Sequence, residues 1–401
     1  MNASSVSICT LAVVCLAPIS SYAGEETQVL GYEGQLMAES ALYESFDGFP
    51  ERYSASMQIQ FRYNYNQRGS DSTTLANPGD DLTLGFTNRR TKLGLKANVT
   101  ESITARAKFG LSQSSGTAIL ENTEMTWKLS DTVIFQAGQF KESLIREENI
   151  SSSKQLAVER SILNETFNQD YFQGVKLTVK EEDWRLMASF GDGFASDNTY
   201  FNSSAEADSS LTIRGELRFG EASWSQYKQF TSWRGANGGL MVGAAFNHQA
   251  MGNTNPATSP STSLETGTID ASLLGDGWNL YAAGIWRTMD SGVSSLTDTG
   301  FLLQGGVFVS DIDEFYARWD VVMPSDSTPI IVGVSGKSDF NTFTVGWNHY
   351  VSPESHAAKF TLEFQHYPDP TTESNITVKG NILPDSTGDQ FAITAQFQLL
   401  F

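Results

Sequence analysis

Apolar and polar side chains alternate along the last twelve residues of the chain. One set of alternate positions is apolar throughout and ends on an aromatic residue: Phe391, Ile393, Ala395, Phe397, Leu399 and Phe401. The positions between them include Gln390, Thr394, Gln396 and Gln398. Because side chains of a β-strand point alternately to its two faces, residues 390–401 are predicted to form a strand with one apolar and one polar face.

The same pattern recurs through most of the sequence. It is most regular from Tyr53 to Asn66, where seven apolar or aromatic positions alternate with seven polar ones. Further runs lie within 103–111, 175–179, 211–219, 240–246, 278–286, 301–309, 315–321, 343–347 and 360–364. Applying the period-two rule from 53 to 401 predicts about 16 strands.

The segments between these runs are alternately short and long. Short ones fall at 100–101, 130–131, 181–183, 275–277, 311–313 and 352–355, and long polar ones at 67–80, 141–170, 192–208, 250–266, 289–298, 324–337 and 368–388. This alternation and an amphipathic last strand ending on Phe resemble bacterial outer-membrane β-barrels, with short turns at one end and long loops at the other. The long segment 221–238 falls where a short turn is expected, and the pattern gives no account of it.

Residues 1–23 are predicted to be a cleavable signal peptide. An apolar stretch runs from Val6 to Ile19, and Ser21-Tyr22-Ala23 has the small-residue pattern of a cleavage site. Both cysteines, Cys9 and Cys15, lie inside it, so the mature chain would hold neither disulfides nor thiolate metal sites. Residues 24–52 are then a periplasmic N-terminal extension and 53–401 the barrel.

The predicted fold is therefore all-β, a transmembrane antiparallel barrel in one domain. A mean hydropathy of −0.26 is compatible with it, since only alternate residues face lipid. The alternative is a large soluble sandwich or propeller, which would have to bury the apolar faces of all these strands.

Charge is unevenly distributed along the sequence. The formal net charge is −20, yet 21 of the 26 Lys and Arg residues lie between Arg52 and Arg234. Many fall on the polar faces of predicted strands, forming a basic strip along the lumen: Arg62, Lys92, Arg106, Lys108, Arg214 and Arg218. Cationic walls in a narrow channel attract anions. The alternative is that these cations only keep the lumen hydrated and balance acidic loops.

Four sequence stretches resemble the phosphate-selective porin O/P family. They are residues 88–96 (NRRTKLGLK), 137–141 (AGQFK), 146–161 (REENISSSKQLAVERS) and 170–175 (DYFQGV). The resemblance implies a trimeric 16-stranded porin whose third external loop, here 141–170, folds into the channel. It also implies that the constriction is lined by Arg89, Arg90, Ser151, Ser152 and Arg160, which would bind the anion. A local bulge is expected to turn the adjacent Arg89 and Arg90 both inward.

One residue departs from the family pattern. Where the phosphate-selective member has a lysine three residues before the paired serines, this chain has Glu148, and a carboxylate there should repel a dianion. The expected function is passive diffusion of small hydrophilic solutes across the bacterial outer membrane, with a weak preference for anions. No cofactor, metal or nucleic acid is expected, and the partners are lipid, the solutes and two further copies.

Two other classes of function are compatible with a barrel. A non-conducting structural or adhesin-type barrel would have a plugged lumen. An outer-membrane enzyme is the least favoured, because no hydrolase or metalloprotease motif surrounds His248, His349, His356 or His366.

Overall fold

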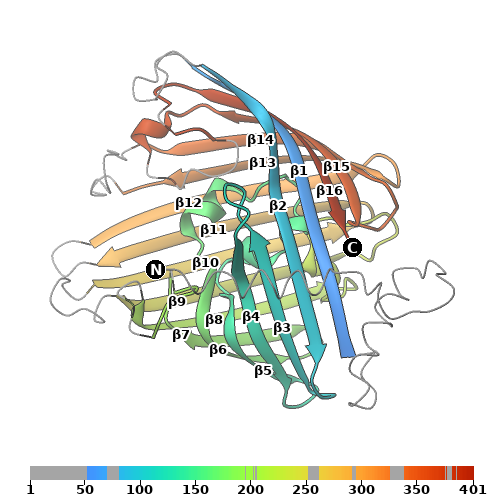
Figure 1. Ribbon diagram of the computed structural model, residues 1–401, viewed down its shortest axis with the longest axis vertical. Coiled ribbons are helices and arrows are strands. Elements are labelled where there is room, and N and C mark those ends of the chain that lie inside the picture. Colours follow the sequence, from blue (N-terminus) through green and yellow to red (C-terminus); the bar gives the residue numbers. More distant parts are fainter. Residues whose placement is uncertain are drawn as a thin grey trace, which may run out of the picture. The chain divides into compact units, whose positions relative to one another are not determined.

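Sixteen antiparallel strands form one closed barrel in the computed structural model of the protein (Figure 1). The structure describes residues 52–69, 81–194, 196–201, 203, 206–251, 262–290, 295–325, 338–374, 376, 382–384 and 386–401. The chain divides into two units, 1–53 and 54–401, and the barrel occupies the second. The predicted fold class is confirmed. The predicted signal peptide and all but the last residue of the predicted extension lie outside the described residues.

Each strand is bonded to the strands before and after it in sequence, and β1 closes the barrel against β16. The first eight strands are β1 (Tyr53–Arg68), β2 (Leu82–Asn98), β3 (Ile103–Leu111), β4 (Ala118–Lys128), β5 (Val133–Lys141), β6 (Tyr171–Lys180), β7 (Trp184–Gly191) and β8 (Ala207–Gly220). The second eight are β9 (Gly239–Met251), β10 (Thr262–Gly275), β11 (Trp278–Asp290), β12 (Ser295–Phe308), β13 (Asp313–Met323), β14 (Phe340–Tyr350), β15 (Ala358–Tyr367) and β16 (Gln390–Leu400).

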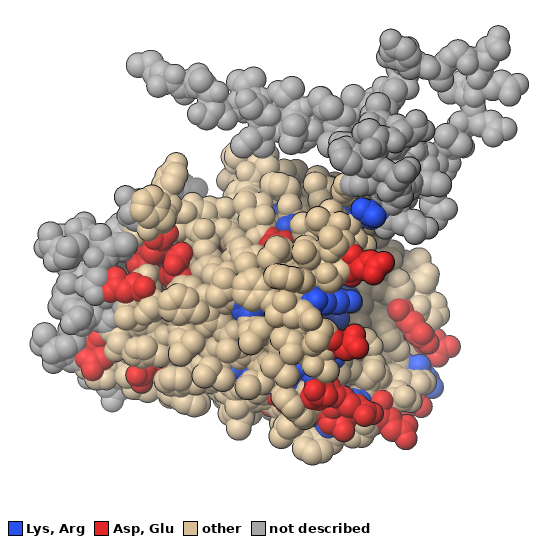
Figure 2. Space-filling view, turned by 90° about the horizontal axis from the view of Figure 1, so that it is seen from below, with Lys and Arg blue, Asp and Glu red and all other residues tan. Residues whose placement is uncertain are grey.

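The last strand has the two faces that its sequence predicts. Ile393 and Phe397 are exposed on the outside, whereas Gln396 and Gln398 are buried on the inside. The backbone N–H of Met57 donates to the carbonyl of Phe401, so the pairing of β1 with β16 extends to the last residue. Exposed apolar side chains recur at alternate positions around the barrel, as a lipid-facing wall requires. Figure 2 shows acidic side chains gathered toward the left and right of one view, with a mostly uncharged band between them.

One end of the barrel carries the short turns, including 99–102, 129–132, 181–183 and 276–277. Outer-membrane barrels have their short turns in the periplasm, so this is the periplasmic end. The prediction of a long connection at 289–298 was wrong: β11 and β12 continue pairing to Asp290 and Ser295, which leaves 291–294 between them. Cross-strand bonds extend this hairpin through residues whose polarity alone predicts a loop.

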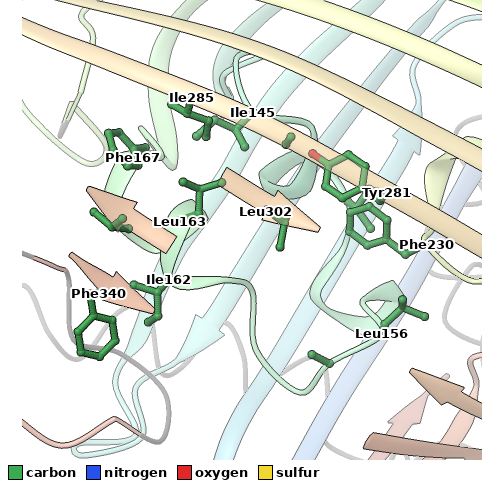
Figure 3. Close-up of a cluster of buried hydrophobic side chains, with 14 of the residues drawn as sticks. Ile145, Leu156, Ile162, Leu163, Phe167, Phe230, Tyr281, Ile285, Leu302 and Phe340 are labelled. Carbon is green, nitrogen blue, oxygen red and sulfur yellow. The ribbon is translucent and has the colours of Figure 1, made fainter. Parts of the chain in front are cut away.

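The segment 142–170 between β5 and β6, called here the inner loop, lies against the inside of the barrel wall. It contains α3 (Arg146–Asn149), the 3₁₀ turn η3 (Ser152–Lys154) and α4 (Ile162–Phe167). Its apolar side chains share a buried cluster with inward-facing residues of the wall, as Figure 3 shows for Leu163, Tyr281 and Leu302. In the described part of the chain, no helix is long and apolar enough to cross a membrane.

Candidate functional site

The inner loop is fixed to one side of the lumen. The N–H of Ile162 donates to Asp320 of β13 at 2.9 Å, and that of Val158 donates to Glu363 of β15 at 3.0 Å. Leu163 and Phe167 of α4 pack beside Gly300 of β12, where any larger side chain would collide with Leu163. The loop therefore fills the half of the barrel that is lined by the later strands.

Two cavities remain on the opposite side, along β1–β6. The larger, of about 580 Å³, reaches Ser54 and Lys96 near the periplasmic end. The smaller, of about 460 Å³, reaches Thr87 and Gln113 near the other end. Both cavities are lined by the same five residues, called here the eyelet: Lys92, Lys141, Glu148, Arg160 and Tyr171. The eyelet is thus the place where the two cavities adjoin.

The eyelet forms where the inner loop leaves the wall and returns to it. Lys141 ends β5 and Tyr171 begins β6, and the two are paired in register. The ammonium of Lys141 lies 5.1 Å from the centre of the Tyr171 ring and also bonds to Glu148. The guanidinium of Arg160 contacts the other oxygen of Glu148 at 3.3 Å. Burial alone would raise the pKa of Glu148, but the two cations outweigh it and lower the pKa to about 2.

Lys92 supplies the third cation of the eyelet from β2. Its ammonium lies 2.6 Å from one carboxylate oxygen of Glu121. The other oxygen of Glu121 lies 3.6 Å from the ammonium of Lys108. Of the five eyelet residues, three are basic and one is acidic, a formal net charge of +2. Glu148 therefore neutralises only part of the basic charge around it.

The two adjacent arginines predicted to line the constriction both reach inward. Arg90 lies 2.6 Å and Arg62 2.8 Å from Glu159 of the inner loop, and Arg89 binds the same carboxylate. On the outer face of β2, the exposed apolar residues are at even positions before the arginine pair (Leu84 and Phe86) and at odd positions after it (Leu93 and Leu95). The alternation of the strand therefore shifts by one residue across Arg89 and Arg90. Burial alone would raise the pKa of Glu159, but the three guanidinium groups hold it well below its usual value. All three arginines line the smaller cavity.

The paired serines lie on the periplasmic side of the eyelet. Ser151 and Ser152 both line the larger cavity. The hydroxyl of Ser152 accepts a hydrogen bond from Gln58 at 3.1 Å, and Ser151 shares one with Ser153 at 2.9 Å. Of the five residues predicted to line the constriction, Arg160 is the one that lines both cavities.

Comparison with known proteins agrees with this geometry. The model of the family described as phosphate-selective porin O and P matches residues 57–285, more than half of the chain. The chain belongs to this family. It is an outer-membrane porin, and both its family and its fold are those of a channel rather than an enzyme. A search of curated protein sequences gives no match.

Solved structures share the fold of this porin at low sequence identity. An anion-selective porin from Comamonas acidovorans is 8% identical with a TM-score of 0.59, over 87% of this chain and 99% of that one. OprB of Pseudomonas putida is 11% identical with a TM-score of 0.58, over 95% and 100%. The outer-membrane channel DcaP of Acinetobacter baumannii is 11% identical with a TM-score of 0.57, over 86% and 97%.

Four of the six residues of the predicted basic strip line the cavities of the porin, and Lys92 lines both. Arg106 and Lys108 line the larger cavity with Lys92, whereas Arg62 lines the smaller one. Arg214 and Arg218 line neither: Arg214 is buried against Glu216 and Asp270, and Arg218 binds Asp183 at the periplasmic end.

Both cavities of the porin have a surplus of basic residues. Seven basic and two acidic residues line the larger one, a formal net charge of +5. Six basic and four acidic residues line the smaller one, a formal net charge of +2. Among the residues that the structure describes, no group of three or more His, Cys, Asp and Glu could hold a metal ion.

Sequence reasoning did not identify Lys141 and Tyr171 as site residues. Their signal is positional, because they are the two residues that flank a long segment without strand periodicity. It also did not identify Glu159, whose role depends on three arginines from two strands. Nothing in the local sequence shows that contact.

Proposed function

We propose that this porin preferentially passes small anions, and that the eyelet is where ions are selected. The observation that carries the proposal is the net charge of +2 on the residues shared by both cavities. A surplus of cations in a narrow space with low-dielectric walls raises the local concentration of anions and lowers that of cations. The anion selectivity named for the Comamonas acidovorans structure agrees with the proposal.

The proposed selection is electrostatic and weak. Each of the three eyelet cations has a carboxylate partner: Lys92 pairs with Glu121, and Lys141 and Arg160 share Glu148. An anion entering the eyelet therefore meets cations that are already partly neutralised. We infer a general anion-preferring pore rather than a high-affinity phosphate channel.

The predicted site residues have separate roles in this proposal. Arg89 and Arg90 attract anions at the outer cavity while holding Glu159 and the inner loop in place. Arg160 contributes at the eyelet, and the hydroxyls of Ser151 and Ser152 face the ion as it leaves toward the periplasm. Three copies are proposed to assemble, an arrangement named for a structure of OmpT from Vibrio cholerae with this fold.

Conductance in different salts tests the proposal on the purified porin in planar bilayers. If anions carry most of the current, replacing K⁺ by Li⁺ in chloride solutions should change the conductance little. Replacing chloride by acetate should lower it markedly. The opposite ranking would refute anion preference, and an absence of current would favour a structural barrel.

A further inference from the structure

The connection between β8 and β9, residues 221–238, is called here the strap. It lies at the periplasmic end, where connections are normally short turns. Gly220 and Gly239 are directly paired at its base, so the two strands meet without needing its length. The strap contains one 3₁₀ turn, η4 (Gln226–Lys228), and buries Tyr227, Phe230, Thr231 and Ser232.

The strap contacts the inner loop inside the barrel. The N–H of Phe230 donates to the carbonyl of Lys154 at 3.3 Å. Arg146 of the inner loop donates to the carbonyl of Tyr227 at 2.6 Å, and its guanidinium lies 5.9 Å from the centre of the Phe230 ring. Arg146 is buried, so a charged side chain joins the two segments away from water.

The strap also contacts the inner wall on the side of the later strands. The rings of Phe230 and Tyr281 of β11 are 4.7 Å apart, and those of Trp233 and Phe308 of β12 are 5.5 Å apart. The hydroxyl of Thr231 lies 3.1 Å from that of Tyr350 of β14.

The far end of these contacts is the turn between β14 and β15. There the side chain of Gln229 lies 3.1 Å from a ring nitrogen of His356, and Trp233 packs against the same ring. The strap therefore reaches from the β8–β9 connection to the β14–β15 turn.

The wall behind the strap and the inner loop is acidic. In the described parts of β9–β16, six charged side chains are at most 4% exposed. Four are acidic and two are basic, a formal net charge of −2: Asp270, Glu314, Asp320, Glu363, Arg318 and Lys359. By contrast, Arg106 and Lys108 on the opposite wall are 57% and 34% exposed in their side chains.

We propose that the strap is a selectivity element, because it closes the acidic half of the lumen from the periplasmic side. Phe230 and Trp233 anchor it, and through Arg146 it holds the inner loop against the acidic wall. Ions are thereby confined to the basic half. This inference rests on the proposed anion preference, since the strap would act by excluding a path that favours cations.

Two sets of variants test the role of the strap in bilayers. The first replaces 222–237 by a two-residue turn, and the second is Phe230→Ala combined with Trp233→Ala. Both should raise the single-channel conductance and shift the reversal potential in a salt gradient toward cations. Asn237→Ala, at an exposed strap position, is the matched control and should change neither. If the deletion variant does not assemble, the Phe230→Ala/Trp233→Ala variant alone decides whether the strap affects conductance and selectivity.

Accessibility of an introduced thiol gives a second readout that does not depend on ion preference. The barrel has no native cysteine. Thr344→Cys lies on the inner face of β14 at a position only 1% exposed, and it should react with a charged thiol reagent only when the strap is altered. Lys108→Cys in the open cavity should react in both backgrounds.

The outcomes separate the two proposals. An unreactive Thr344→Cys and unchanged selectivity in both strap variants would overturn the strap inference. Cation preference in the parent porin would instead overturn the proposed function. A reactive thiol together with a shift toward cations supports the strap as a selectivity element.

Discussion

Removing the charge of Lys92 should weaken anion preference by an amount that depends on salt. Lys92 is one of three cations in the eyelet, so Lys92→Gln reduces the formal charge there from +2 to +1. Its carboxylate partner Glu121 keeps Lys108 and the hydroxyl of Tyr171 as neighbours. The variant therefore removes charge while leaving the surrounding contacts in place.

Coulomb's law gives the size of the effect. A unit charge about 5 Å from a passing ion contributes about 0.8 kcal/mol in a water-like dielectric. Screening at 0.1 M salt, where the Debye length is about 10 Å, reduces this to about 0.5 kcal/mol. Removing the charge raises the free energy of an anion in the eyelet by this amount and lowers that of a cation equally. The anion-to-cation permeability ratio should therefore fall about fivefold. At about 1 M salt, where the Debye length is about 3 Å, the change should be less than twofold.

The assay is the reversal potential of single channels in a KCl gradient, measured at low and high mean salt. Lys92→Arg keeps the charge and should behave as the parent. Lys96→Gln removes the same charge from the larger cavity alone and should have a smaller effect. Electrostatic selection by Lys92 is refuted if Lys92→Gln leaves the permeability ratio unchanged at about 0.1 M salt, or if its effect does not weaken as salt rises.

Three other predictions concern the inner loop. Glu159→Gln should increase anion preference, because three arginines lose their counter-charge, and should lower the unfolding temperature measured in detergent. Gly300→Ala should destabilise the barrel by about 1–3 kcal/mol, since the new methyl would lie 2.2 Å from Leu163; Gly215→Ala, with no atom within 4 Å, is the control for denaturant unfolding. Glu148→Gln should lower the unfolding temperature at neutral pH and have little effect near pH 2. The folded-state pKa of Glu148 is about 2 against a usual 4.5, so its stabilising contribution is present above about pH 4.5 and is lost as the pH falls toward 2. An equal loss of stability at both pH values would contradict this.

The barrel was predictable because its signal is local. Each wall residue faces either lipid or the lumen, and the alternation of apolar and polar residues in β1 and β16 shows which side each residue faces. Strand ends were less predictable, since β11 and β12 continue past the apolar positions by backbone pairing. The pairing of residues near the closure, such as Gln60 with Gln398, follows from a closed sheet of fixed register rather than from local sequence.

The site was only partly predictable because its charges are arranged by tertiary contacts. The family resemblance implies that Arg89, Arg90 and Arg160 line a constriction, but not that the first two share Glu159. Comparison with the family pattern predicts that Glu148 repels anions, but it does not show that Glu148 lies between two cations. The strap is a similar case: its contacts join elements that are far apart in the sequence.

The sign of the reversal potential shows directly whether the pore prefers anions or cations. With the purified porin in a neutral bilayer and a tenfold KCl gradient, the positively charged eyelet should displace the potential toward the equilibrium potential of chloride. A potential displaced toward that of potassium would contradict it, because a pore with a net positive eyelet cannot favour cations by electrostatics.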